Sequence, residues 1–425
     1  MKKFICILLT LLMVFAVVGC YSSSSDDSGN ADSGKTELVI WAHNDQEVWI
    51  NSYQAIADAF TAENPDITIR FETFPYDEFE SKVLTSLTSK SGGADIYEMW
   101  GGWGTDYAST GALAALPDAM ASEIMNDAYP STFGALEYEG KLYGMPQEFN
   151  IESGAMLVND HLVTDAMPTT WDELIALGKK MTVEENGMTT VEGFDFVNWD
   201  GVPYLFTSMI LSQGAQYLNE DGTFNFSSPE AIKAFTTLHD LVTVDKVASI
   251  EGLTDSSGLE GYYQLYADCA AIVPRGPWTI AEGIELYDLV YGTDFSYEAM
   301  PWYGSQPAFA AETGWSMAVN AASPNQEAAF KFLEYFFQDD QILSHNVACG
   351  QIPAKKSVAQ SAEYLQKFPY AEPLVGILQY GQFIGYFNTD SFKEAINNTF
   401  VDYCSGIYAN AEDALAELED VLAGI

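Results

Sequence analysis

This chain of 425 residues is rich in two kinds of side chain that can bind or react with a ligand, carboxylates and aromatic rings. It contains 61 Asp plus Glu, 4 His, 9 Trp, 24 Tyr and 25 Phe. The sequence has no serine-hydrolase elbow, no P-loop and no glycine-rich dinucleotide loop. Its histidines are far apart and form no i, i+4 metal-binding pair. We therefore expect a site that binds rather than an enzyme, with neither a metal nor a cofactor.

The net charge restricts the class of partner. Only 17 Lys plus Arg oppose the acids, which gives a formal net charge of −44. Nucleic acid needs a basic footprint that neutralises phosphate, so no nucleic-acid partner is expected. The same field opposes adsorption to anionic lipid and favours a neutral or cationic ligand. The surplus of aromatic rings either fills a large core or stacks on that ligand.

The N-terminus reads as an export signal rather than as part of the fold. Lys2 and Lys3 precede the uncharged run 4–18, which is shorter than the ~20 residues of a membrane span. Gly19 and Cys20 then follow, and the run with this ending resembles a bacterial lipobox. We predict a lipoprotein signal peptide over 1–19 and lipid on Cys20. An ordinary secretory signal with an incidental cysteine is the alternative.

A polar segment follows the signal. Residues 20–36 are rich in Ser, Asp and Gly and have almost no apolar content, which is typical of a disordered tether. We expect the body of the protein outside the cytoplasmic membrane, on the cell surface or in the periplasm. The lipid would be its only attachment to the membrane.

The remaining cysteines do not decide whether the protein contains a disulfide. Once Cys6 goes with the signal and Cys20 with the lipid, Cys269, Cys349 and Cys404 remain. Three thiols cannot all pair with one another. One disulfide and three free buried thiols are both compatible with the sequence.

Alternating strand and helix patterns begin the mature chain. The predicted elements are a strand over 37–42, a helix over 51–62, a strand over 67–72, a helix over 77–89 and a strand over 94–100. This order indicates a parallel sheet covered by helices. Such sheets bind ligands beyond the carboxyl ends of their strands, so the loops after Trp41 and Trp100 are expected to line a site.

A second block of elements carries clear helix starts. Thr170 and Glu173 have the spacing of a capping box, and Pro229 opens a helix that follows Ser228. The acids of 219–223 lack the twelve-residue calcium-loop pattern and are predicted to form a turn.

Several longer segments identify a family. They read GKLYGMP at 140–146, MLVN at 156–159, PTTWDEL at 168–174, AIVPRGPW at 271–278 and MAVNAASPN at 317–325. In this order and spacing they resemble the family 1 extracellular solute-binding proteins, the maltose-binding-protein-like receptors of ATP-driven importers. The resemblance extends from about Leu38 to Leu422.

The resemblance implies an α/β fold with two lobes, each a mostly parallel sheet with flanking helices, joined by a multi-segment hinge. Transferred to this chain, lobe 1 would comprise 37–147 and 306–350, and lobe 2 would comprise 148–305 and 351–425. The crossing segments would lie near 146–150, 301–306 and 350–354. Closure of the lobes around the ligand would be a hinge motion.

The resemblance also implies the function. The protein would capture a mono- or oligosaccharide between its lobes and deliver it, as a monomer, to the permease subunits of an ABC importer. A polyamine or other cationic solute on the same fold is the alternative that the acidic field favours. An exported glycoside hydrolase would need paired carboxylates and measurable turnover.

The resemblance transfers to particular side chains. Trp278 and Trp315 would stack on sugar faces, and Asp45 and Glu148 would accept hydroxyl hydrogen bonds. The full predicted set is Trp41, Asn44, Asp45, Trp100, Trp103, Glu148, Asn150, Trp199, Asp200, Tyr204, Trp278, Glu312 and Trp315. Trp171 is expected to pack in its own lobe, and Arg275 to pair with a nearby acid.

Overall fold

The computed structural model describes residues 35–44, 46–89, 93–196, 200–254 and 261–424. The predicted signal, the tether up to residue 34, the lipidation site Cys20 and the predicted ligand residues Asp45 and Trp199 lie outside these ranges. Within them, no helix has both the length and the apolar character that a membrane crossing requires.

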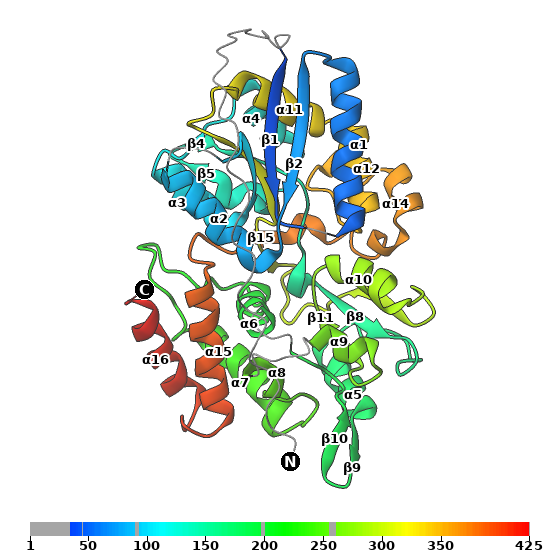
Figure 1. Cartoon of the computed structure of the whole chain (residues 1–425). Coiled ribbons are helices and arrows are strands. Elements are labelled where there is room, and N and C mark those ends of the chain that lie inside the picture. Colours follow the sequence, from blue (N-terminus) through cyan, green and yellow to red (C-terminus); the bar gives the residue numbers. More distant parts are fainter. Residues whose placement is uncertain (1–34, 45, 90–92, 197–199, 255–260, 425) are drawn as a thin grey trace, which may run out of the picture. The chain divides into compact units, whose positions relative to one another are not determined.

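One mixed sheet organises the first lobe (Figure 1). Its strands are β1 (Thr36–Ala42), β2 (Ile67–Thr73), β3 (Ile96–Trp100), β4 (Leu113–Ala114), β7 (Gly144–Pro146) and β14 (Trp315–Asn320). The order is β2-β1-β3-β14-β4, and β7 also pairs with β14. Strand β1 is parallel to β2 and β3, which confirms the predicted βαβαβ arrangement. Strand β14 is antiparallel to β3, β4 and β7.

Helices cover both faces of this sheet. They are α1 (Glu47–Glu63), α2 (Tyr76–Ser89), α3 (Gly101–Ser109), α4 (Asp118–Asp127), α11 (Gln326–Phe336) and α12 (Asp339–Ala348). Tyr53 and Phe60 of α1 join Ile40 in one buried cluster, whereas Phe79 and Val83 of α2 join Met99 and Ala318 in another. The period-2 alternation of each strand therefore supplies two separate cores.

The second lobe is built on an antiparallel sheet. Strands β8 (Ala155–Asn159), β11 (Ile272–Pro274) and β12 (Phe295–Ala299) pair in the order β11-β8-β12, with β8 antiparallel to both neighbours. The expectation of a mostly parallel sheet is wrong for this lobe. The long segment between β8 and β11 re-enters the sheet at the end where β8 leaves it, so β11 runs opposite to β8. Strands β11 and β12 run in the same direction on either side of β8, and the segment that contains α10 crosses between them.

Helices surround this second sheet. They are α5 (Trp171–Met181), α6 (Gly201–Ser212), α7 (Pro229–Thr243), α8 (Glu251–Thr254), α9 (Gly261–Tyr266), α10 (Trp278–Tyr287), α15 (Asp390–Cys404) and α16 (Ala411–Leu422). Every residue of α6 is buried, and α15 and α16 lie side by side near it (Figure 1). Along β8, Leu157 packs in one core cluster and Met156 and Val158 in another, so both faces of the strand are covered.

Short elements complete the chain. They are β5 (Glu137–Tyr138), β6 (Lys141–Leu142), β9 (Val183–Glu185), β10 (Met188–Val191), β13 (Phe309–Ala311), β15 (Gly381–Phe383), α13 (Lys356–Ala359) and α14 (Ala362–Lys367). Four 3₁₀ turns span Pro130–Leu136, Glu152–Gly154, Pro369–Ala371 and Leu378–Tyr380.

Two of the predicted crossing segments lie side by side. Glu148 forms a β-bridge with Pro353, and the Phe149 amide donates to the Ile352 carbonyl at 2.7 Å. Helices α13 and α14 pack against α12, whereas α15 packs against α6 and α7. The predicted lobe boundaries remain predictions.

The two helix starts and the turn that were predicted in the second block are confirmed. Thr170 Oγ1 accepts from the Glu173 amide at 3.2 Å and begins α5, and the Ser228 hydroxyl caps α7. Residues 219–223 form a turn in which the Asp221 carboxylate accepts from the Thr223 amide at 3.1 Å. The three cysteines in the described part of the chain are free.

Candidate functional site

A group of rings gathers at the end of β3 and the start of β14. Trp100 and Trp315 occupy paired positions on these strands, and Trp103 meets Trp315 edge-on with ring centroids 5.7 Å apart. His43 lies flat against Trp315, with centroids 3.6 Å apart and ring planes within 1°. Tyr76 meets Trp315 edge-on at 6.2 Å. We call these five side chains the aromatic wall.

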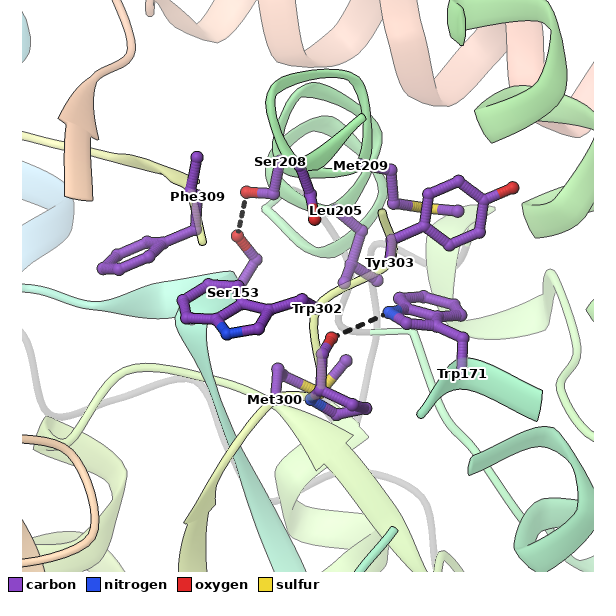
Figure 2. Close-up of a pocket in the computed structure, with 13 residues that line it drawn as sticks. Ser153, Trp171, Leu205, Ser208, Met209, Met300, Trp302, Tyr303 and Phe309 are labelled. Atoms are coloured by element: carbon purple, nitrogen blue, oxygen red, sulfur yellow. Dashed lines mark hydrogen bonds between the residues drawn. The ribbon is translucent and has the colours of Figure 1, made fainter. Parts of the chain in front are cut away.

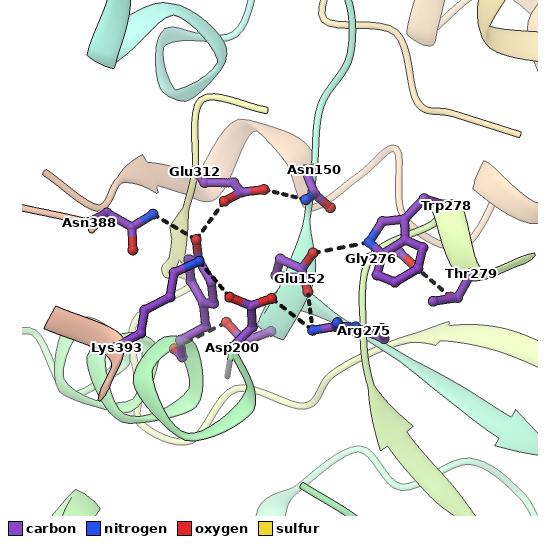
Figure 3. Close-up of polar contacts among 12 residues, drawn as sticks. Asn150, Glu152, Asp200, Arg275, Gly276, Trp278, Thr279, Glu312, Asn388 and Lys393 are labelled. Carbon is purple, nitrogen blue, oxygen red and sulfur yellow. Dashed lines mark hydrogen bonds and ion pairs between the residues drawn. The ribbon is translucent and has the colours of Figure 1, made fainter. Parts of the chain in front are cut away.

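A buried carboxylate lies beside this wall. Glu312, in the segment between β13 and β14, is 6% exposed. Its carboxylate accepts hydrogen bonds from Trp100 Nε1 at 3.2 Å and from the Tyr204 hydroxyl at 2.6 Å. It also accepts from Asn150 Nδ2 (Figure 3). Glu312 therefore connects the first-lobe sheet, a predicted crossing segment and α6 of the second lobe. Burial raises the pKa of this carboxyl, although Lys393 opposes the change.

Two cations meet on one aspartate next to it. Asp200, which precedes α6, accepts from Arg275 Nη1 at 2.9 Å and from Lys393 Nζ at 2.6 Å. Burial opposes its ionisation, but Lys393 and Arg275 outweigh burial and hold the pKa of Asp200 below its ordinary value. The expectation that Arg275 pairs with a local acid is confirmed.

Trp278 begins α10 and contacts the same ionic group. The Arg275 guanidinium carbon lies 4.9 Å from the centroid of its ring. Trp278 Nε1 donates to Glu152 Oε1 at 3.4 Å. Burial raises the pKa of Glu152 to about 7, with Arg275 opposing. We call Asn150, Glu152, Asp200, Tyr204, Arg275, Glu312, Asn388 and Lys393 the polar network.

Lys393 joins the polar network to the aromatic wall. Its ammonium lies 4.8 Å from the centroid of the Trp100 ring and 5.5 Å from that of Tyr204. Asn388, just before α15, donates from Nδ2 to the Tyr204 hydroxyl at 2.8 Å. A cation over an aromatic face is attracted by the ring quadrupole, so these contacts hold the two groups of residues together.

Glu148 lies behind Trp315. The Trp315 amide donates to Glu148 Oε1 at 3.3 Å, and the side chain is buried. Burial raises the pKa of Glu148 to about 8, which the amide hydrogen bond only partly offsets. The carboxyl is therefore mostly protonated near pH 7.

Most of the predicted ligand residues meet in this region. Nine of them belong to, or contact, the aromatic wall or the polar network. They are Trp100, Trp103, Glu148, Asn150, Asp200, Tyr204, Trp278, Glu312 and Trp315. Trp41 packs on Phe74 and Tyr97, and its Nε1 donates to Glu72 at 2.6 Å. It borders the same buried cluster as Trp103 and Trp315 but is not one of the five side chains of the aromatic wall. Asn44 accepts from the Gln46 amide at 2.9 Å and orders the approach to α1.

Three residues of the aromatic wall and the polar network, His43, Asn388 and Lys393, are not among the predicted ligand residues. His43 follows directly on the predicted strand-end residues Trp41 and Ala42, so its position was a usable signal. Lys393 lies within a helix pattern, where a lysine is normally solvent-exposed, and its burial follows from Asp200. Nothing in the local sequence of Asn388 signals its contact with Tyr204.

Two hollows lie near these residues. One lies beside α6 and is lined by Ser153, Trp171, Ser208, Trp302 and Phe309 among others (Figure 2). There Trp171 Nε1 donates to the Pro301 carbonyl at 2.9 Å, in agreement with the structural role expected of this ring. The other is lined by Gly101, Gly102, Thr105, Glu312 and Asn388 among others, and so reaches the polar network.

The described residues contain no group of three or more His, Cys, Asp or Glu that could hold a metal ion. The assembled site instead offers indole faces, hydrogen-bond acceptors and donors, and acids compensated by two cations. Such a surface suits a polar solute with apolar faces.

Comparisons with known proteins agree with this architecture. Residues 47–342 match the family described as bacterial extracellular solute-binding protein. The maltotriose-binding protein of Pyrococcus abyssi is 24% identical over 343 residues, which cover 78% of this chain and 70% of the relative. The arabinooligosaccharide-binding protein of Halalkalibacterium halodurans is 24% identical over 318 residues, which cover 72% of this chain and 68% of the relative.

Solved structures share the fold. A cyclic alpha-maltosyl-1,6-maltose binding protein from Arthrobacter globiformis superposes with a TM-score of 0.75 at 22% identity, covering 92% of this chain and 99% of that chain. A cyclo/maltodextrin-binding protein complexed with maltotetraose also gives a TM-score of 0.75, at 20% identity, covering 92% of this chain and 98% of that chain. The predicted two-lobed α/β class is thereby confirmed. The chain belongs to the bacterial extracellular solute-binding protein family, as its sequence segments indicated.

Proposed function

We propose that this protein captures a neutral oligosaccharide between its two lobes, without turning it over, and delivers it to an ABC importer. One observation carries this proposal. The polar network, in which Lys393 and Arg275 balance the acids, contacts half-buried tryptophans that come from both lobes. A pyranose presents C–H faces that stack on indole rings and hydroxyls that bond to carboxylates and amides.

Charge distinguishes a sugar from a polyamine. Although the chain carries −44 overall, Asp200 is already engaged by Lys393 and Arg275. Burial raises the pKa of Glu148 to about 8 and that of Glu152 to about 7, which reduces the negative charge that an amine would meet near neutral pH. Lys393 also lies over the ring of Trp100, where its positive charge would repel an amine.

The relatives narrow the choice of probe. Two of them are named for binding maltotriose and arabinooligosaccharide, and one solved structure holds maltotetraose. A thermal-shift screen with maltotriose, an arabinotriose and spermidine is the first test, since a ligand that binds only the folded state raises the melting temperature. Stabilisation by spermidine alone would favour the cationic alternative, and release of reducing sugar would favour a hydrolase.

Calorimetric titration of variants tests the site. Trp278→Ala should weaken sugar binding at least about tenfold, because a stacked ring contributes about 1 kcal/mol beyond area burial and ~1.4 kcal/mol corresponds to a tenfold change. Trp171→Phe, which alters a tryptophan that packs in its own lobe and donates to the Pro301 carbonyl, is the control, and its sugar affinity should be unchanged. Equal affinity of Trp278→Ala and wild type, with intact circular dichroism, would remove Trp278 from the site.

The delivery route rests on the sequence. We propose that lipid on Cys20 anchors the protein to the cell membrane, on the cell surface or in the periplasm, and that the monomer presents its sugar to permease subunits. Cys20→Ala should release the protein from membranes. Mass spectrometry that finds an unmodified N-terminus at another position would reject the anchor.

A further inference from the structure

We propose that His43 and Arg275 are positioning residues that fix the two platform tryptophans, Trp315 and Trp278, in their binding orientation. The inference rests on the proposed function in so far as these rings receive a sugar. Each tryptophan has a flat, nitrogen-rich side chain against one of its faces, and each of these side chains is itself held by a buried carboxylate.

The His43–Trp315 pair shows this arrangement with the closest geometry. The two rings are parallel within 1° at a centroid separation of 3.6 Å, so the imidazole covers one indole face. His43 is held twice by Glu98, through its backbone amide at 2.8 Å and through Nδ1 at 2.7 Å. Glu98 is fully buried and also accepts from the Tyr53 hydroxyl at 2.5 Å. The imidazole therefore cannot rotate without breaking a buried hydrogen bond.

The other ring neighbours of Trp315 are not parallel to it. Trp103 and Tyr76 lie nearly perpendicular to the indole, and Phe79 is tilted at 52° with its centroid 6.2 Å away. Among these ring contacts only His43 is stacked flat on Trp315, so His43 is the neighbour whose loss should most change the orientation of the indole plane.

The Arg275–Trp278 pair repeats the arrangement in the second lobe. The guanidinium carbon lies 4.9 Å from the Trp278 centroid, while Asp200 binds Arg275 at 2.9 Å and Glu152 lies 3.9 Å away. Glu152 also accepts from Trp278 Nε1 at 3.4 Å. One carboxylate thus contacts both the arginine and the ring that the arginine supports.

Pre-orientation explains why such supports affect affinity. A side chain that is free in the unbound protein must be ordered when ligand binds, and that cost reduces affinity. His43 and Arg275 order the two indoles in advance. They act through the tryptophans, so their loss should weaken binding without removing any contact that the tryptophans make.

Three variants separate the ring of His43 from its hydrogen bond. His43→Ala removes both, His43→Gln keeps a donor for Glu98 but no ring, and His43→Phe keeps a ring but no donor. We expect maltotriose affinity to fall about tenfold in His43→Ala and His43→Gln and to stay within about threefold of wild type in His43→Phe. His239→Ala is the matched control. It removes an imidazole of α7 that stacks on the ring of Tyr403 in α15, with ring centroids 4.0 Å apart. Its maltotriose affinity should be unchanged.

A spectroscopic measurement without ligand tests the same inference independently of sugar choice. The near-ultraviolet circular dichroism of wild type minus that of Trp315→Phe isolates the signal of the fixed Trp315 ring. In the His43→Gln background this difference should be mostly lost, and in the His43→Phe background it should persist. If wild type does not bind maltotriose, the proposed function fails for that sugar, but this difference spectrum still decides the positioning role.

Arg275→Lys tests the second support. Lysine retains the positive charge for Asp200 but lacks the planar group that stacks on an indole. Maltotriose affinity should fall several-fold. The near-ultraviolet circular dichroism difference between proteins with Trp278 and with Trp278→Phe should also be smaller in the Arg275→Lys background than in wild type. An unchanged difference spectrum in His43→Gln, or unchanged maltotriose affinity in a His43→Gln protein that binds the sugar as wild type, would overturn the proposal.

Discussion

Glu98 and Glu312 are both buried carboxylates that accept three hydrogen bonds, yet their pKa values move in opposite directions. Glu98 accepts hydrogen bonds from Tyr53 and from His43, and the His43 ring stacks on Trp315. We call Glu98, His43 and Tyr53 the support cluster. Burial opposes its ionisation, but the His43 imidazole outweighs burial, and the pKa of Glu98 is lowered. In the polar network, burial prevails over Lys393 and the pKa of Glu312 is raised, with Asp200 adding to the rise.

The number of hydrogen bonds therefore does not set the direction in which the pKa of a buried acid moves. The nearest charged groups do, because a second carboxylate offsets the effect of a nearby cation on that pKa. The support cluster is therefore a fixed structural element. The polar network instead shares two cations among several acids, so its protonation state should respond to pH and to ligand.

Removal of the central acid of the polar network should have the largest effect. Asp200→Asn leaves Lys393 and Arg275, each 5% exposed, without their shared carboxylate. A buried ion pair broken from one side typically costs about 3–5 kcal/mol of stability. Urea denaturation at pH 7 measures this loss, with the exposed Asp402→Asn as control. A loss below about 1 kcal/mol would mean that solvent reaches these cations.

Glu148 lies between the two regions and should make stability depend on pH. Its folded pKa of about 8 exceeds its ordinary value of 4.5, so the folded state holds a proton that the unfolded state releases. Stability should consequently fall as pH rises from about 4.5 through about 8. Glu148→Gln removes this penalty and should stabilise the protein relative to wild type on the order of 3 kcal/mol at pH 8.5.

Denaturant unfolding at pH 5 and pH 8.5 checks this expectation. The difference between Glu148→Gln and wild type should be small at the lower pH and large at the higher one. A difference that does not change between the two pH values would show that Glu148 is ionised in the folded protein throughout.

Matched tyrosine variants distinguish the two regions by function. The hydroxyls of Tyr53 and Tyr204 each donate to a carboxylate, Glu98 or Glu312, and each accepts from a side-chain amide, Gln147 or Asn388. Tyr53→Phe and Tyr204→Phe should each lose about 1–2 kcal/mol of stability. Tyr204→Phe should lower sugar affinity more than Tyr53→Phe, because Tyr204 belongs to the polar network whereas Tyr53 acts on Trp315 only through Glu98 and His43. Titration calorimetry that finds an equal loss of affinity in the two variants would contradict this difference between the regions.

An exposed histidine provides the smallest expected effect. His161 lies between Asp268 at 3.0 Å and Asp294 at 2.9 Å, and hydrogen bonds from its ring to these two carboxylates raise its pKa. Its contribution should be complete below its ordinary pKa and lost as pH rises through the raised value. The melting temperature of wild type should exceed that of His161→Gln by about a degree at pH 5.5 and by less at pH 9. A constant difference would show that the ion pairs contribute nothing.

Local patterns predicted the first elements because their signals are short-range. The apolar spacing of α1 and the alternation of β1 and β2 are visible within a few residues, and the caps of α5 and α7 depend on single side chains. The antiparallel direction of β8 has no local signal, since it depends on where two distant strands dock.

The resemblance supplied positions for Glu312, Trp278 and Trp315, and the structure places all three in or beside the aromatic wall and the polar network. Their role as ligand residues, like that of Trp41, stays a prediction. The resemblance could not supply contacts that the protein's own packing decides, such as the hydrogen bond from Trp41 to Glu72. The burial of Lys393 and the stack of His43 depend on partners that are remote in sequence.

The place of β14 within the first sheet has a consequence for biosynthesis. Ser316 and Met99 are 217 positions apart, yet the Ser316 hydroxyl donates to the Met99 carbonyl inside one sheet. Until β14 has been translated, β3 keeps an unpaired edge that invites association with other chains. Pairing across such a sequence distance is also slow. Chains truncated before residue 315 should therefore aggregate, and a circular permutant that places β14 next to β3 in sequence should reach the native state faster.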